Sequence, residues 1–216
     1  MVAAACGHRA GQTPTPKPTA PLPTAAIAGQ QVSIFPLTLV AAEDSLHWET
    51  ALADREASLA RADSIIGTLI KVRAPEVVWV LPAELRRAAR RAPSVATDPD
   101  RMSTSLLRAE NLDVVPDPLR SQLRTLEAIA GGRYALIPAA LIYRRPGPAP
   151  AAGQPAGPDP SAPRTTDHPP GLAELSLVLV DVRLGRISWR TVARGAGDDP
   201  WSALTRAVKS LTPGLP

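Results

Sequence analysis

The sequence is poor in the residues that most often build stabilising cross-links or reactive sites. Cys6 is the only cysteine in 216 residues, so no disulfide can form within the chain. Aromatic residues make up 3% of the sequence. No stretch stays apolar for the roughly 18 residues that a membrane-spanning helix needs. These shortages argue against a disulfide scaffold and a helical membrane domain.

Lysine is also scarce, since Lys17, Lys71 and Lys209 are the only three, yet the net charge is +4 with a pI of about 9.8. Arginine supplies the rest. A basic balance permits weak attraction to anionic membranes, polysaccharides or nucleic acids, but a whole-genome compositional habit is the simpler explanation.

Four arginines gather in one short predicted helix, residues 83–91: Arg86, Arg87, Arg90 and Arg91. Like charges four residues apart cost a helix a few tenths of a kcal/mol each. A solvated face is the simpler interpretation, and contact with an anionic surface is the functional one. Nucleic acid is disfavoured as a partner because few aromatic side chains are available to stack on bases.

The first residues read Met-Val-Ala-Ala-Ala-Cys, followed by a tract rich in Thr and Pro. Small residues before a lone cysteine are typical of a lipoprotein processing site, where Cys6 would carry the lipid. Only five residues precede Cys6, fewer than a signal peptide requires. Either translation starts further upstream or Cys6 is an incidental thiol. We assign residues 1–30 to a truncated signal and a Thr/Pro-rich tether.

A second Pro-, Gly- and Ala-rich tract, residues 146–171, interrupts two predicted strands. Its composition cannot offset the entropy of ordering it, so we predict a disordered insertion at a hairpin tip. The remaining residues of 31–212 form one predicted domain, large enough to bury a core without metals or disulfides.

The strongest local pattern lies in residues 174–194. Two β-rich runs, residues 175–182 and 186–193, are joined by Arg183, Leu184 and Gly185, which predicts a hairpin with Gly185 at positive φ. The first run is apolar on both faces, which indicates a strand covered on both sides. The second alternates more cleanly, as on a strand nearer an edge.

Further strands are predicted at residues 31–40, with a bulge or an end at Pro36, and at 76–81 and 133–144. Helices are predicted at residues 50–72, with Asp63 on the solvent face, at 83–91, and after three Asp-Pro starts at Asp98, Asp117 and Asp199. Gly131 and Gly132 supply a helix stop.

The predicted fold class is therefore α/β (α+β). It has a single mixed five-stranded sheet in which three parallel strands precede an antiparallel meander, with helices packed on it and a strand order of 2-1-3-4-5.

This layout resembles a group of bacterial envelope domains. The likeness rests on residues 33–40, 133–138 and 177–190, the last with Asp181, Gly185 and Trp189 in an Asp-x-x-x-Gly turn before a strand ending near Trp. It resembles the N-terminal α/β domain of the TolB translocation protein, curli-secretion (CsgG-type) lipoproteins and lipoprotein activators of penicillin-binding proteins. The resemblance implies an envelope-facing binding or assembly module, and the chain lacks a clear segment for inserting β-strands into a membrane.

A search for catalytic chemistry finds little. His47 is the only histidine outside the Pro-rich tracts, and a general base needs a positioned partner. Glu43 and Asp44 are adjacent, and turn formation explains them. No spacing suggests a metal site, a cofactor or a serine-nucleophile elbow, and the carboxylates beside Gly195-Ala196-Gly197 would repel a phosphate. The tryptophans at 48, 79, 189 and 201 are expected in the core.

We therefore expect no catalytic residues, no metal and no cofactor. The favoured hypothesis is a non-catalytic module on the periplasmic face of the envelope, held to the membrane by lipid on Cys6 and contacting an envelope protein or polymer. The alternative is a soluble enzyme with an unrecognised active site, in which His47 could take part.

Overall fold

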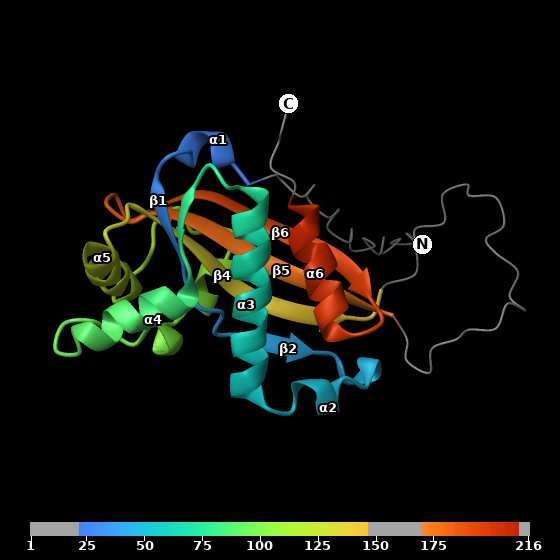
Figure 1. Ribbon diagram of the computed structural model, residues 1–216. Coiled ribbons are helices and arrows are strands. Elements are labelled where there is room, and N and C mark those ends of the chain that lie inside the picture. Colours follow the sequence, from blue (N-terminus) through green and yellow to red (C-terminus); the bar gives the residue numbers. More distant parts are fainter. Residues whose placement is uncertain (1–21, 147–169, 212–216) are drawn as a thin grey trace, which may run out of the picture.

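The computed structural model describes residues 22–146 and 170–211, which form a mixed sheet with helices on both faces (Figure 1). The predicted segments before Leu22 and most of the predicted insertion at 146–171 lie outside the described residues. The strands are β1 (Gln31–Ile34), β2 (Val40–Ala42), β3 (Val78–Val80), β4 (Tyr134–Arg144), β5 (Gly171–Asp181) and β6 (Arg186–Gly197). The helices are α1 (Thr24–Ile27), α2 (Glu49–Leu52), α3 (Arg55–Arg73), α4 (Pro82–Arg91), α5 (Leu119–Ala130) and α6 (Pro200–Ser210), and the short 3₁₀ helices are η1 (Asp44–Leu46), η2 (Pro99–Arg101) and η3 (Thr104–Arg108).

The order of the strands confirms the predicted topology. Along the sheet it runs β3-β1-β4-β5-β6, with β1 parallel to β3 and β4 and the last three strands antiparallel. The predicted first strand is split near Pro36 into β1 and β2, and β2 pairs separately with β4. The described sheet therefore has six strands instead of five, because proline cannot donate to the ladder.

Strand β5 lies in the interior of the sheet and is covered on both faces, as its sequence predicts. Leu175, Leu177 and Leu179 enter one core, and Val178 and Val180 enter the other. The hairpin turn to β6 has Gly185 at φ 69°, which confirms the predicted glycine conformation. β5 begins at Gly171 and not near Glu174, so Gly171 belongs to the sheet.

The two cores separate the helices into two layers. α1, α3 and α6 cover one face, with Ile66, Ile70 and Leu204 fully buried or nearly so. α4, α5, η2 and η3 cover the other through residues such as Leu85, Leu107 and Leu123, whereas Leu46 of η1 belongs to the first core. Figure 1 shows α3 and α6 on the same side of the sheet. Of the tryptophans expected in the core, Trp48 and Trp79 are buried, and Trp189 and Trp201 are partly buried against the first core.

A β-bulge in β4 decides which of its side chains reach each core. The register shifts between Pro138 and Ala140, where proline has no N–H to donate. Before the bulge Ile137 faces the second core, and after it Leu141 and Tyr143 face the first. A shift of one residue exchanges the faces of a strand, so the bulge moves the odd-numbered side chains of β4 from the second core to the first.

Three predicted helix boundaries need correction. The predicted helix at residues 50–72 is divided, because the Asp54 side chain accepts a hydrogen bond from Ala57 N–H at 2.9 Å and starts α3 there. Asp98 opens only the short η2. Asp117 does not cap backbone N–H groups, since its carboxylate accepts from Ser121 Oγ and the helix begins two residues later at Leu119.

The start of α6 is as predicted. Asp199 accepts from the N–H groups of Trp201 and Ser202 at 2.9 and 3.1 Å, and Pro200 occupies the first helical position. The glycines before it lie in β6 and serve packing. A Cβ on Gly195 would lie 2.1 Å from Ala207 N, so glycine there lets α6 approach the strand closely.

Candidate functional site

The basic helix α4 is fixed to the domain by a buried ion pair. Arg86 Nη2 lies 2.5 Å from Asp63 Oδ2 on α3 and 2.7 Å from Asp100 Oδ1 on η2. The other oxygen of Asp63 accepts from Leu37 N–H at 2.8 Å. These contacts join α3, α4, η2 and the connection between β1 and β2, and removing one partner would leave a buried charge unpaired.

The position of Asp63 is the least accurate prediction from the sequence in this region. We predicted it on the solvent face of its helix, but its side chain is 4% exposed. Its position, four residues after Leu59 and three before Ile66, is on the apolar stripe, and that spacing is a signal that could have identified it. Burial raises the pKa of Asp63 to about 6, against the lowering effects of Leu37 N–H and Arg86. Asp100 is the largest of the influences that raise the pKa of Arg86.

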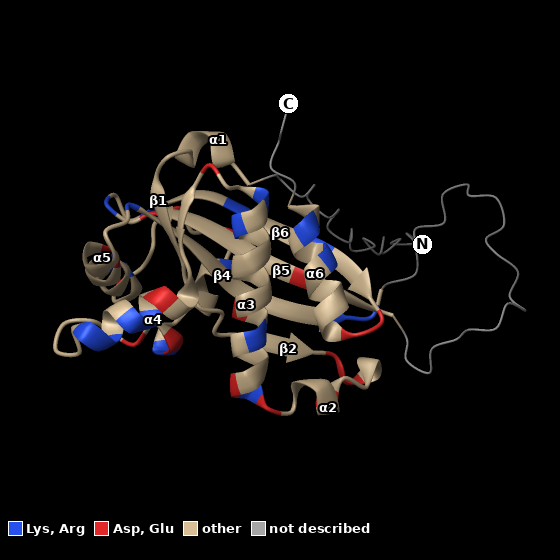
Figure 2. Ribbon diagram, in the orientation of Figure 1, with Lys and Arg blue, Asp and Glu red and all other residues tan. Residues whose placement is uncertain are grey.

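The four arginines singled out in the sequence are not equivalent. Arg86 is 22% exposed and occupied by two carboxylates, so it is not a free cation. Arg87, Arg90 and Arg91 are exposed, and Arg87 lies 3.9 Å from Glu84 on the same helix, a weak surface pair. Figure 2 shows the basic side of α4 on the surface of the domain. We call Arg87, Arg90 and Arg91 the α4 basic surface.

A hollow of about 430 Å³ lies beside this surface, between α4 and the residues around η2. Arg90 lines it together with Arg86, Asp98 and Asp100. Asp100 is paired with Arg86, and Asp98 accepts from Asp100 N–H at 3.1 Å. Arg90 is therefore the cation at this hollow that forms no ion pair within the described residues.

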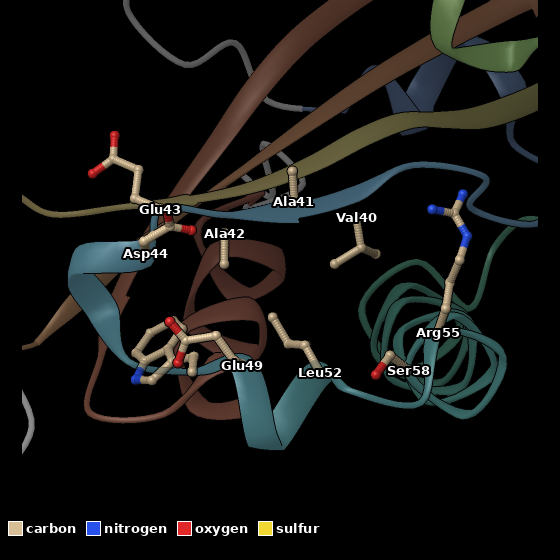
Figure 3. Close-up of a pocket in the computed structure, with 10 residues that line it drawn as sticks. Val40, Ala41, Ala42, Glu43, Asp44, Glu49, Leu52, Arg55 and Ser58 are labelled. Atoms are coloured by element: carbon tan, nitrogen blue, oxygen red, sulfur yellow. The ribbon is translucent and has the colours of Figure 1, made fainter.

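A second hollow, of about 190 Å³, lies between β2, α2 and the start of α3. Figure 3 shows Val40, Ala42 and Leu52 pointing into it, with Asp44 and Glu49 to one side and Arg55 on the other. Glu43 accepts from Arg145 N–H at 2.9 Å, and Arg55 donates to Thr38 O at 2.8 Å. An apolar floor with carboxylates at its rim can bind a ligand, and the lining contains no histidine or cysteine.

The other sequence candidates are not gathered around either hollow. His47 ends η1 at φ 55°, where its N–H donates to Asp44 O at 3.1 Å. Within residues 22–146 and 170–211, no group of three or more His, Cys, Asp or Glu side chains is placed to hold a metal ion. No helix in the same ranges has the length and apolar character to cross a bilayer. Cys6 lies outside the described residues.

One buried acid was not found by sequence reasoning. Glu127, on α5, is 2% exposed, and in the described part of the chain its carboxylate has only the Ser33 hydroxyl nearby as a weak polar neighbour. Burial raises its pKa to about 7. Its spacing of four from Leu123 places it on the buried stripe of α5, but the polar side chain hid that assignment.

Comparisons with known proteins yield distant structural likenesses. No family model and no curated protein matches the chain. The LpoB C-terminal domain from Salmonella enterica is 14% identical, with 79% of this chain and 83% of that chain covered and a TM-score of 0.34. A PelC dodecamer chain from Paraburkholderia phytofirmans is 14% identical, with 91% and 94% covered and a TM-score of 0.39. Lipoprotein GNA1162 from Neisseria meningitidis is 15% identical, with 78% and 83% covered and a TM-score of 0.31.

The chain is thus similar, at a distance, to domains that include a bacterial lipoprotein. At TM-scores below 0.5 these likenesses carry no argument about function, which rests below on the residues of this chain. The predicted resemblance to TolB, curli-secretion lipoproteins and activators of penicillin-binding proteins stays a prediction.

The buried ion pair leads to an expected effect on stability. Arg86→Gln should lower the free energy of unfolding by about 3–5 kcal/mol, because Asp63 would remain buried without its cation. Arg87→Gln, on the same helix, should change it by less than about 0.5 kcal/mol. Chemical denaturation of both variants measures this, and equal small losses would contradict a stabilising role for Arg86.

Glu127 should make stability depend on pH. The folded chain keeps its proton up to a pKa of about 7, whereas the unfolded chain releases it near 4.5. The unfolded state therefore binds fewer protons in this window, and the free energy of unfolding falls as pH rises from about 4.5 to 7, by up to roughly 3 kcal/mol. Glu127→Gln should remove this component, and the exposed Glu56→Gln should keep it. Asp63 titrates equally in both variants, so a difference between their denaturation profiles belongs to Glu127.

Proposed function

We propose that the chain is a non-catalytic binding or assembly module of the bacterial cell envelope, anchored by lipid on Cys6 and contacting an envelope protein or polymer. The observation that carries the proposal is the construction of the α4 basic surface. Arg86 is used to hold the helix in place, while Arg87, Arg90 and Arg91 extend outward. A rigid helix with several outward cations is suited to an anionic partner, because little side-chain or backbone order is lost beyond the contact itself.

The hollows also favour binding over catalysis. A catalyst needs a nucleophile or an acid and a base in hydrogen-bond reach of each other. The hollow beside α2 offers carboxylates and apolar side chains, and its Arg55 is directed to a backbone carbonyl. Both hollows suit recognition of a partner's side chains, and no contact in the described residues specifically supports the enzyme alternative.

The anchor would come from the N-terminal sequence. Ala3, Ala4 and Ala5 precede Cys6, and the Thr/Pro-rich tract that follows is typical of an extended tether. A single acyl chain gives marginal membrane affinity, so stable attachment needs several chains or added basic contacts. A multiply acylated Cys6 would supply it and place the module on the periplasmic face.

Cell fractionation tests the anchor. We expect the chain, expressed from its natural start in a Gram-negative host, to sediment with membranes and to carry acyl mass on Cys6. Cys6→Ala should release the chain or stall its processing, whereas the nearby His8→Ala should leave both unchanged. A wild-type chain that is wholly soluble and carries no acyl group would overturn the lipoprotein proposal and leave the enzyme alternative.

Co-sedimentation with purified peptidoglycan, an anionic envelope polymer, tests the α4 basic surface. In the unlipidated full chain, the triple change Arg87→Gln, Arg90→Gln and Arg91→Gln should weaken binding about tenfold or more. The matched change of Arg124, Arg183 and Arg186 to Gln removes the same charge and should have a smaller effect. Equal effects would show attraction by net charge alone. Failure of the unaltered chain to sediment would exclude this polymer as the partner.

A further inference from the structure

One end of the sheet combines exposed apolar side chains with positive charge. The strand ends at Gln31, Val78, Tyr134, Asp181 and Arg186 lie within one residue of a common line across the sheet. β1, β3, β4 and β6 therefore begin here, and β5 ends here. We call this the tether end. The described chain also enters here, because Leu22 lines a small hollow with residues in or just after the last turns of α3 and α6.

The β5–β6 turn presents an apolar side chain at this end. Leu184 is 55% exposed and Val114 is 47% exposed. The two segments adjoin, since Val115 N–H donates to Gly185 O at 2.9 Å and Val114 bridges Arg186. Single exposed leucines are common on proteins, so the pairing and its surroundings carry the argument.

The turn holds Leu184 outward rigidly. Asp181 accepts from Leu184 N–H at 3.1 Å and is paired with Arg133 at 2.6 Å. Gly185 N–H donates to Asp181 O at 2.8 Å. The side chain of Arg120 fills the space below, so that a Cβ on Gly185 would lie 2.4 Å from Arg120 Nε. The exposure of Leu184 is therefore a property of an ordered turn.

Charge is divided between the two ends of the sheet. Arg183 and Arg186 flank Leu184 and are exposed, and neither forms an ion pair within the described ranges. The acidic residues of the tether end are the exposed Glu76, Asp113 and Asp117, together with the buried Glu127 and the paired Asp181. The opposite end carries a run of acidic residues around η1, α2 and the start of α3: Glu43, Asp44, Glu49, Asp54 and Glu56. Figure 2 shows these acidic positions around α2, away from the basic side of α4.

We infer that the tether end rests on an anionic phospholipid bilayer, with Leu184 and Val114 in the interface and Arg183 and Arg186 at the headgroups. This inference rests on the proposed lipid anchor. Leu22 lies sixteen positions after Cys6, a distance that an extended Pro-rich chain spans in about 50 Å. The tether would keep this end near the bilayer at high effective concentration, so a weak interfacial contact is sufficient. Each arginine near an anionic surface strengthens binding about fivefold.

Quenching of tryptophan fluorescence by brominated phospholipids tests the contact. The full chain is coupled through Cys6, its only cysteine, to a maleimide lipid in vesicles containing phosphatidylglycerol. Coupling replaces the natural anchor, so a lack of quenching would contradict docking of the tether end but would say nothing about lipidation of Cys6. Cell fractionation tests lipidation separately. Leu184→Trp should be quenched at least twofold more than the wild-type background. Leu106→Trp is the matched control, because Leu106 is 53% exposed and lies on η3, where Thr104 contacts Thr38 beyond the far end of β1.

The charge requirement has its own matched pair. In the Leu184→Trp chain, Arg183→Gln with Arg186→Gln should lower the equilibrium constant for docking of the tethered domain on the bilayer, on the order of tenfold or more. Arg101→Gln with Arg108→Gln, which removes two exposed arginines on η2 and η3, should change it little. Vesicles of phosphatidylcholine alone should give weak quenching. Equal quenching of the two tryptophan variants, or equal quenching on neutral and anionic vesicles, would overturn the inference.

Discussion

The burial of β5 on both faces is the constraint on which the rest of the domain depends. A strand whose leucines and valines point in opposite directions requires a hydrophobic layer on each side. α3 and α6 supply one layer, and α4 and α5 supply the other. The bulge at Ala139 and the glycines of β6 are local adjustments to these two layers. The bulge changes which β4 side chains face each core, and the glycines let α6 come close. Helix α4 exposes its basic side to solvent because its opposite side packs on the second core through Leu85 and Ala89.

Much of this architecture could be predicted because patterns of neighbouring residues determine it. The apolar faces of residues 175–182, the glycine at 185 and the Asp199-Pro200 start each depend on neighbours within a few positions. The strand order followed from crossover rules. What failed locally was the length of elements: Asp54 starts a new helix within a continuous apolar pattern, and Pro36 separates two strands where a bulge was one of two options.

The candidate site was less predictable because its chemistry depends on distant partners. Nothing near Arg86 in the sequence distinguishes it from Arg87. Asp63, 23 positions away, holds Arg86 in an ion pair, whereas Arg87 stays on the surface. The burial of Glu127 also depends on residues distant in the sequence, since it is decided by strands that pack on α5. The turn of Leu184 was predicted correctly, but its neighbour Val114 comes from a segment about 70 positions earlier, so a surface shared by the two was beyond sequence reasoning.

The pairing of Arg144 with Leu172 means that β4 ends and β5 begins in adjacent positions of the same ladder. Antiparallel partners lie only about 5 Å apart. The register of these strands is fixed by the bulge and by the cores. The link between them therefore joins two positions that the sheet already holds next to each other. Its length and composition are thus free to drift during evolution without moving either strand. This joint would also accept new chain ends in a circular permutant, or a second domain inserted between two fixed points of the sheet.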